Sequence, residues 1–555
     1  MVIAETRPES AETGPAPSPH SPSFDDRDAA LLGQVRTDLG RRAARSVAWR
    51  MGASGAVAAA RLAALAVLAR ELSPGVFGVM AMSTVAAGFA AATVDVGFGS
   101  ALVQRERLSA AHLWWVFRFS LMLSLGLWGV CALASPWVAR FFHEPAVGPV
   151  LAVGAGVLPL SALSLTPRAV LMRHLEFRKL GLCDLGEAVT NGGLSILLAI
   201  RGCGVWSLVA GSLAGGAVSA ALLTVLSPWR PGPAGQTDDR RGLFAFGAAV
   251  TLVASLFYWT ERIDNLIVGR LLSAEALGIY VVAFNLAIMI AGQLSVGTRV
   301  VAFPVFSAIQ DDPHRLAAAY RRSVRWSAAL AFPCCALAGA LAPELISLLL
   351  GEAWTPAVLP FRLLLAVGAI RALYGFSGPM LRATGRPRAE LLLQAFLCAG
   401  VGVAAAVGAR AGVNGVAAAV AAFMLFLGGP VFIQVAAGFA KANPSLQASH
   451  RVSGLGLRAV LSAAAAPALA AGLGGAAALA GVRALAGLHG DAPPLLLVLA
   501  GLGCGLVTYL VALRALAADL LVEARTHLLP PAGGCRWAVA DIPATPESEE
   551  PGRLP

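Results

Sequence analysis

Charged residues are scarce in this sequence. Asp, Glu, Lys and Arg make up 13% of its 555 residues, whereas a soluble globular protein carries roughly 25%. Hydrophobic residues make up 57%, and the mean hydropathy is +0.73. These values exclude an ordinary soluble domain and predict an all-α polytopic membrane protein. The net charge of +11 is therefore attributed to loop arginines that set membrane orientation, and no nucleic-acid partner is expected.

Signatures of enzyme chemistry are also missing. The sequence has no H-E-x-x-H, no G-x-S-x-G and no Walker A motif. Its eight cysteines show no C-x-x-C pair and no metal-ligand spacing, which indicates small buried apolar residues instead of a disulfide framework. We therefore predict that the protein is not an enzyme and that it has no metal site and no cofactor.

Long apolar runs fill most of the chain. A spanning helix needs about 20 apolar residues, and fourteen such segments can be counted. They are residues 46–69, 76–101, 112–134, 147–171, 182–200, 205–227, 243–268, 276–304, 323–350, 357–381, 389–409, 412–438, 455–480 and 493–517.

The domain organisation follows from these segments and from the polar stretches between them. Residues 1–44 are predicted to be a disordered tail, and a linker rich in Pro, Gly and charge separates two six-helix lobes. Two further helices and a tail rich in Pro and Glu complete the chain. The predicted boundaries are 1–44, 45–228, 229–242, 243–440, 441–520 and 521–555.

Loop charge predicts the orientation, because short cytoplasmic loops carry an excess of Lys and Arg. The N-terminal tail and alternate loops contain twenty basic residues, and the opposite loops contain six. This distribution predicts a multi-pass protein of the cell (plasma or inner) membrane with both termini in the cytoplasm. The six residues of the opposite set are Arg70, Arg140, Arg201, Arg270, Arg410 and Arg483.

The two lobes show a weak internal repeat. The stretch Arg70-Glu-Leu-Ser-Pro-Gly-Val-Phe-Gly78 matches Arg270-Leu-Leu-Ser-Ala-Glu-Ala-Leu-Gly278 at an offset of 200 residues. Glu144 matches Glu352 at an offset of 208, and the residues after Gly204 match those after Gly415 at 211. The offset between matching residues increases steadily along the chain, as expected when small insertions enter loops after a duplication. Because each repeat has six spans, the lobes are predicted to be parallel repeats around a central cavity.

Seven stretches carry motifs that can be compared with known families: Ala69–Gly78, Asp95–Gln104, Pro167–Arg173, Leu175–Lys179, Gly202–Val209, Asp264–Leu272 and Leu277–Tyr280. In their order and spacing they resemble the polysaccharide flippases of the multidrug/oligosaccharidyl-lipid/polysaccharide (MOP) exporter superfamily. The resemblance covers about residues 44 to 440 and implies two helical bundles that alternate access to a central cavity. It further implies a lipid-linked oligosaccharide as the substrate, with other polysaccharide-assembly proteins as candidate partners besides membrane lipid.

Arginines inside the predicted spans are candidates for binding a pyrophosphate, because the planar guanidinium matches phosphate oxygens. Arg50 and Arg61 are eleven residues apart, so they lie only about 20° apart around a helix. Arg299 and Arg371 are the other cavity candidates. Arg50 could equally place its charge at the membrane surface, since long side chains near helix ends often do so.

The acidic candidates are Glu261, Asp264 and Asp95, which would bind a coupling ion or a proton. Glu261 is the repeat equivalent of position 61, so these two charges are expected at corresponding points of the two lobes. A purely structural ion pair is the alternative. Asp184 and Glu187 are expected at an exposed helix start, where the helix dipole stabilises carboxylates.

The leading hypothesis is a flippase that moves a polyprenyl-pyrophosphate-linked oligosaccharide outward for cell-surface polysaccharide biosynthesis. A multidrug or cation exporter of the same superfamily is the alternative among transporters, and a polysaccharide polymerase or ligase is the alternative among enzymes. The last two spans are rich in small residues, which favours either close helix packing or a groove facing lipid. The sequence leaves both roles open.

Overall fold

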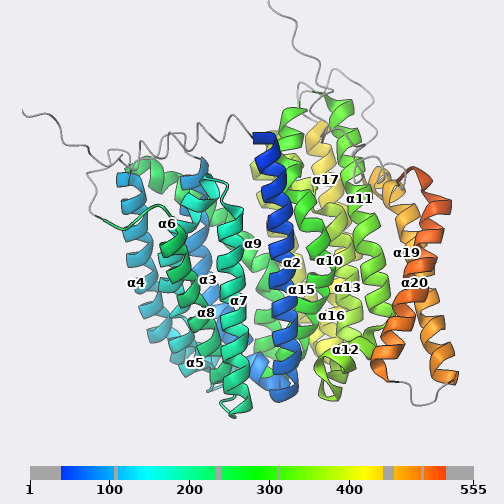
Figure 1. Ribbon diagram of the computed structural model, residues 1–555, viewed down its shortest axis with the longest axis horizontal. Coiled ribbons are helices and arrows are strands. Elements are labelled where there is room, and N and C mark those ends of the chain that lie inside the picture. The colour runs from blue at the N-terminus through cyan, green and yellow to red at the C-terminus, as the bar shows by residue number, and fades with distance from the viewer. Residues whose placement is uncertain are drawn as a thin grey trace, which may run out of the picture. The chain divides into compact units, whose positions relative to one another are not determined.

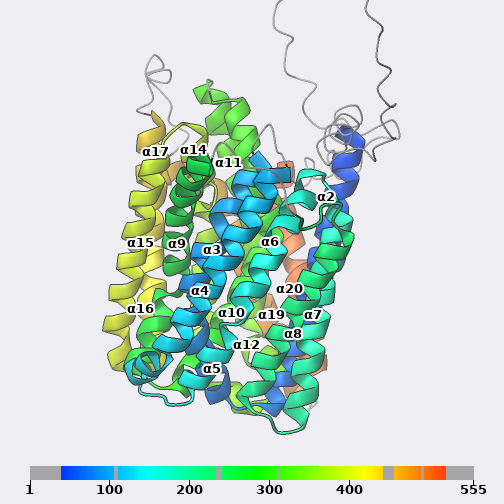
Figure 2. The same ribbon diagram turned by 90° about the vertical axis from the view of Figure 1, so that its left-hand side faces the viewer.

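The computed structural model describes residues 39–104, 110–232, 240–310, 312–441, 456–488 and 493–520. Within these residues every regular element is a helix, which confirms the predicted all-α class (Figures 1 and 2). The contacts divide the chain into two compact units, and the division falls inside one helix, between Arg262 and Ile263.

The first unit contains six complete helices of the described residues, α3 without its first two residues, and the first part of α9. These helices are α2 (Leu39–Glu71), α3 (Pro74–Gln104), α4 (Ala110–Phe142), α5 (Val147–Gly154), α6 (Val157–Arg173), α7 (Phe177–Ile200) and α8 (Val205–Leu226), with α9 spanning Arg240–Leu271.

The second unit contains the end of α9 and all later helices. They are α10 (Ala274–Ala308), α11 (Pro313–Ala340), α12 (Ala342–Leu350), η1 (Glu352–Ala357), α13 (Val358–Tyr374), α14 (Ser377–Ala383), α15 (Pro387–Gly408), η2 (Ala409–Ala411), α16 (Gly412–Phe423), η3 (Met424–Gly428), α17 (Gly429–Lys441), α19 (Leu457–Leu488) and α20 (Pro494–Leu516).

The number of membrane crossings was expected to be fourteen. By length and composition, ten helices among the described residues could cross a membrane, or eleven if α11 and α12, bent by 78°, form one span. One of those ten segments, Pro387–Gly438, contains both α15 and α16, which pack against each other and therefore supply two crossings. The charged helices α7 and α9 fall outside that count. Fourteen crossings stay a prediction.

The division of the chain lies later than the predicted linker at 229–242, because the start of that linker and the helix after it both contact helices of the first unit. After the linker, the Tyr258 hydroxyl on α9 donates to the carbonyls of Thr84 and Val85 on α3, at 3.1 and 3.2 Å. Gly88 makes room for this side chain, since a Cβ at that position would collide with the Tyr258 ring. The predicted domain boundaries stay predictions.

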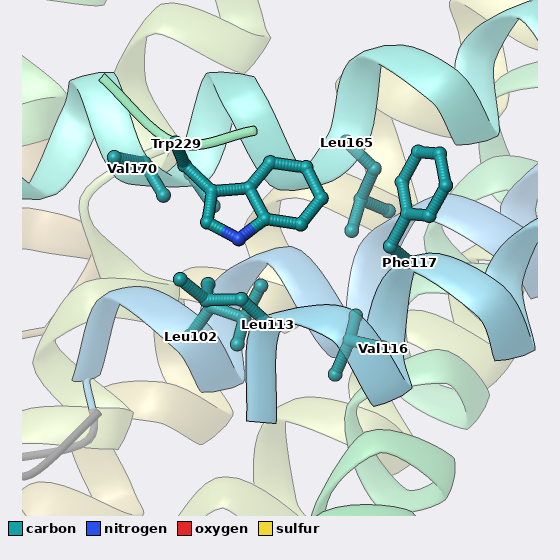
Figure 3. Packing of buried hydrophobic residues seen from close by; sticks show 8 residues of the cluster. Leu102, Leu113, Val116, Phe117, Leu165, Val170 and Trp229 are labelled. Carbon is teal, nitrogen blue, oxygen red and sulfur yellow. The ribbon is translucent and has the colours of Figure 1, made fainter. Parts of the chain in front are cut away.

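At the start of the linker, Trp229 is buried in an apolar cluster formed by α3, α4 and α6 (Figure 3). Its ring lies 5.5 Å from that of Phe117, and only 3% of the residue is exposed. Arg230 next to it donates to carbonyls at the end of α8, including that of Ser227 at 2.6 Å. The segment that leaves α8 is therefore fixed to the first unit at its start.

Matching turns in the two units support the predicted duplication. The Leu72 N–H donates to the Leu68 carbonyl at the end of α2, and the Leu272 N–H donates to the Val268 carbonyl at the end of α9. Both distances are 2.9 Å, and the residue numbers differ by 200 in each case.

A second pair of turns matches at an offset of 210. The backbone takes the left-handed conformation at Leu175 (φ 56°) between α6 and α7, and at Gly385 (φ 72°) between α14 and α15. The residue before each donates to a carbonyl four residues earlier, from His174 to Val170 and from Thr384 to Met380. A third pair, His143 (φ 55°) and Gly351 (φ 95°), matches at 208.

The last two helices, α19 and α20, pack closely against α11 within the second unit. In Figure 1, α19 and α20 lie beside α11, and the Tyr509 hydroxyl on α20 donates to the Ala329 carbonyl on α11 at 2.6 Å. After α20, Asp519 accepts from Arg325 at 2.8 Å, and this hydrogen bond lowers the pKa of Asp519. The small residues of these helices therefore serve helix packing, one of the two roles left open by the sequence.

Glycine substitutions in α20 test this packing. A Cβ at Gly505 would collide with Leu337 and lie 2.8 Å from the Gly474 carbonyl oxygen, whereas a Cβ at Gly503 would meet nothing within 4 Å. We expect Gly505→Ala to lower the free energy of unfolding by about 1–3 kcal/mol through overpacking. Gly503→Ala should be neutral or slightly stabilising, since Ala favours a helix over Gly. Thermal unfolding of the purified protein measures both, and equal midpoints for the two variants would contradict the close packing.

Candidate functional site

Helix α7 carries two carboxylates, and each has an arginine partner on a neighbouring helix. Arg168 Nη2 on α6 lies 2.8 Å from Asp184 Oδ1, and Arg61 Nη2 on α2 lies 3.9 Å from Glu187 Oε1. Asp184 and Glu187 are three residues apart, so they are neighbours on the surface of α7. Three helices of the first unit thus bring together four charges, which we call the α7 charge cluster.

Small residues allow α2 and α7 to approach closely enough for this arrangement (Figure 2). A Cβ at Gly181 would lie 2.6 Å from the Ala53 Cβ, and one at Gly192 would lie 2.7 Å from the Ala64 Cβ. The residue numbers differ by 128 in both pairs, so the two helices run parallel in one register. Arg61 lies between these two contacts along α2, as Glu187 does along α7.

The two ion pairs of the cluster differ in strength. The 2.8 Å distance between Arg168 and Asp184 is that of a charge-assisted hydrogen bond, and their side chains are 32% and 20% exposed. Arg61 and Glu187 are 3.9 Å apart, beyond hydrogen-bond distance, and the Arg61 side chain is 63% exposed. The Arg61 donors are therefore accessible to another anion.

The exposure of the Arg61 side chain limits what can surround the cluster, because an ionised group costs several kcal/mol in hydrocarbon. Arg61 lies within Gly52–Glu71, one of the segments apolar and long enough to cross a membrane. A guanidinium with that exposure at this depth requires water or a polar ligand around it. The arrangement suits the binding of an anionic group within a wet space.

The carboxylate of Asp264, in the second unit, is held more tightly than the two carboxylates of the α7 charge cluster. Asp264 is 3% exposed, and its Oδ2 accepts from the Tyr280 hydroxyl at 2.7 Å while Oδ1 accepts from the Asn265 N–H at 2.8 Å. Tyr280 is fully buried. The Asn265 Oδ1 is also buried, and within the residues that the structure covers it has no hydrogen-bond partner. Asp264 is therefore fixed in place by its own helix and by α10.

The other predicted site residues are placed less completely. Arg371 is partly buried on α13 of the second unit, and Glu261 is partly buried on the first-unit part of α9. Arg50, Asp95 and Arg299 belong to α2, α3 and α10, but their side chains lie outside the described residues. The roles predicted for these five residues stay predictions.

Sequence reasoning misjudged the carboxylates of α7. Asp184 and Glu187 were expected at an exposed helix start, but α7 begins at Phe177, which places them in its second and third turns. Arg168 was not singled out at all, although it follows Pro167 in a motif that carried the family resemblance. The three-residue spacing on one helix was the signal that a shared face was present.

Comparison with known proteins identifies the family. A family model described as polysaccharide biosynthesis protein matches residues 67–359, which is more than half of the chain. The chain belongs to this polysaccharide biosynthesis protein family. The match begins near the end of α2, and it includes α6 and α7, which carry three of the four members of the α7 charge cluster.

Curated relatives of this family member are distant in sequence. The lipopolysaccharide biosynthesis protein WzxC of Escherichia coli (strain K12) is 24% identical over 59% of this chain and 66% of its own length. The succinoglycan biosynthesis transport protein ExoT of Rhizobium meliloti is 26% identical over 56% of this chain and 63% of its own. The chain thus spans slightly less than two thirds of these relatives.

Solved structures share the fold of this family member. A lipid II flippase, MurJ, in an inward closed conformation superposes with a TM-score of 0.65 at 11% identity, over 84% of this chain and 98% of MurJ. An inward-facing multidrug resistance MATE family transporter of the MOP superfamily gives 0.55 at 15% identity, over 71% and 96%. These likenesses confirm the fold expected for the superfamily. The long apolar helices and the family membership support a multi-pass membrane protein.

Single substitutions separate the two ion pairs of the α7 charge cluster. Arg168→Ala removes the 2.8 Å charge-assisted hydrogen bond to the mostly buried Asp184, so we expect a loss of about 1–3 kcal/mol of stability. Arg61→Ala removes a loose, exposed pair and should cost less than about 1 kcal/mol. Thermal unfolding followed by tryptophan fluorescence distinguishes the two variants. A loss for Arg61→Ala as large as that for Arg168→Ala would show that both pairs are structural.

Proposed function

We propose that this protein is a flippase that moves a polyprenyl-pyrophosphate-linked oligosaccharide from the cytoplasmic to the outer leaflet by alternating access. Membership of the polysaccharide biosynthesis family supports the pathway, and the fold shared with transporters supports the mode of action. The observation that carries the proposal is Arg61, a loosely paired and exposed guanidinium within a membrane-spanning segment.

The chemistry of this substrate matches what Arg61 offers. A pyrophosphate presents several anionic oxygens, and a guanidinium binds two of them at once through its planar donors. Glu187 at 3.9 Å partly compensates the charge of Arg61 when no substrate is present. A pyrophosphate that displaces Glu187 replaces a loose ion pair by charge-assisted hydrogen bonds. Substrate binding and release then exchange one partner of Arg61 for another, which avoids an unpaired charge in either state.

Other charged residues take proposed roles in the same cycle. Arg50, Arg299 and Arg371 are further candidates for lining the cavity, while Glu261, Asp264 and Asp95 are candidates for binding a coupling ion or proton. The proposed orientation places both termini in the cytoplasm, and other polysaccharide-assembly proteins are proposed partners.

The alternative functions fit less well. A multidrug or cation exporter shares the fold, as the MATE transporter shows, but a cationic substrate would be repelled by Arg61. A polymerase or ligase would need catalytic residues on a sizeable outer segment. The relative ExoT is named a transport protein, and the relatives WzxC and ExoT are both named for polysaccharide biosynthesis. We therefore propose transport without covalent chemistry.

The leaflet distribution of the lipid-linked oligosaccharide tests the proposal. In cells without the protein, we expect the intermediate to accumulate on the inner leaflet, protected from an impermeant reagent added outside. Arg61→Ala should slow its appearance on the outer face about tenfold, the effect of about 1.4 kcal/mol in binding. Arg61→Lys should recover part of the rate because it keeps the charge without the planar fork.

Arg483→Ala is the matched control, since Arg483 is an exposed arginine in α19 without a partner among the described side chains. It should leave translocation unchanged. Accumulation of the intermediate on the outer leaflet in cells lacking the protein would refute the flippase and favour the polymerase or ligase.

A further inference from the structure

A groove of about 760 Å³ lies where α4 ends and α5 begins, away from the α7 charge cluster. Its volume is in the range of small-molecule sites. Its walls are mainly apolar and include the prolines Pro136, Pro145 and Pro149, whose rings limit backbone motion. Three charged or ionisable side chains also line it, namely Arg140, His143 and Glu144.

The position of the groove along α4 puts it at a membrane surface. The helix has 33 residues and is therefore about 50 Å long, whereas the hydrocarbon core is only about 30 Å thick. Its final turns extend into the headgroup region. Trp137 and Phe141, next to the groove-lining residues in the sequence, are 65% and 43% exposed. Exposed aromatic side chains are typical of the membrane interface.

The guanidinium of Arg140 is available for a ligand. Among the described residues, no side chain or carbonyl pairs with it, although Arg168, Arg325 and Arg382 each have a carboxylate partner. The positive charge of Arg140, in the last turn of α4, also interacts favourably with the helix dipole. That interaction does not use the hydrogen-bond donors of Arg140, so they are free to bind.

His143 is held in an unfavourable backbone conformation. Its φ of 55° is in the left-handed region, where a side chain costs conformational energy. Gly351, its repeat equivalent in the second unit, has a φ of 95° and avoids this cost. The first repeat therefore keeps an imidazole at a turn that glycine would form more easily. Strained side chains of this kind are concentrated at binding sites.

The chemistry of the lining selects a ligand class. Arg140 and His143 supply donors for a phosphate, and the carboxylate of Glu144 accepts from hydroxyl groups. The proline-rich walls suit the apolar part of a lipid just below its headgroup. We propose that this groove binds the headgroup of an anionic glycerophospholipid of the surrounding bilayer, with phosphatidylglycerol as the model ligand. The assignment requires a membrane protein but does not depend on the proposed flippase activity.

Phosphatidylglycerol binding to the purified full-length protein in detergent tests the assignment, with native mass spectrometry and thermal unfolding as readouts. We expect phosphatidylglycerol to bind and stabilise the protein, and phosphatidylcholine to do so at least tenfold more weakly. Arg140→Ala should weaken phosphatidylglycerol binding about tenfold. His143→Gly relieves the backbone strain, so it should raise the unfolding midpoint of the lipid-free protein while it weakens binding.

Arg201→Ala is the matched control because Arg201 is an exposed arginine at the end of α7, predicted on the same membrane side but outside the groove. It should bind phosphatidylglycerol as the unaltered protein does. Equal losses for Arg140→Ala and Arg201→Ala would overturn the proposal, since they would indicate non-specific attraction. Binding of lipid-linked saccharide in the groove without any binding of phosphatidylglycerol would overturn it too, and would connect the groove to transport.

Discussion

The cost of placing ionised groups in hydrocarbon governs this structure. Each such group must be paired, hydrogen-bonded or surrounded by water or another polar group, and the described charges inside the helices differ in how tightly they are held. Asp264 is buried and accepts from the Tyr280 hydroxyl and the Asn265 N–H, Asp184 is paired with Arg168, and Arg61 is exposed beside a distant Glu187. The way in which each charge is satisfied therefore indicates whether it stabilises the fold or is available for a ligand.

The duplication explains where the two units can differ without loss of the fold. Equivalent turns at offsets of 200, 208 and 210 keep the helix ends in corresponding places. Between these turns, the charges differ from one repeat to the other: the first repeat has Arg61 where the second repeat has Glu261. Gly351 and Gly385 stand where the first repeat has His143 and Leu175, so glycine relieves the turns in one repeat and not in the other.

Much of the fold was predictable because hydrophobic length and loop charge act locally. Each predicted span coincides with a helix or a broken helix, and the turns after Leu68 and Val268 match as the repeat required. The partners of the charges were not predictable. The register between α2 and α7 depends on close contacts such as that of Gly192 with Ala64, and Ala/Gly-rich helices offer many such registers. A carboxylate such as Glu187 could not be matched to an arginine 126 positions away without that register.

A comparison of the ion pairs supports the role proposed for Arg61. Arg382 holds the almost fully buried Glu390 at 2.8 Å, and Arg168 holds Asp184 at the same distance. To break either pair would leave a poorly solvated carboxylate, so neither arginine can leave its partner cheaply during a transport cycle. Arg61 at 3.9 Å from Glu187 loses little when the two separate, since the pair is beyond hydrogen-bond distance and the Arg61 side chain is 63% exposed. A site that must bind and release an anion repeatedly needs such a weak resting interaction, and among these pairs only that of Arg61 provides it.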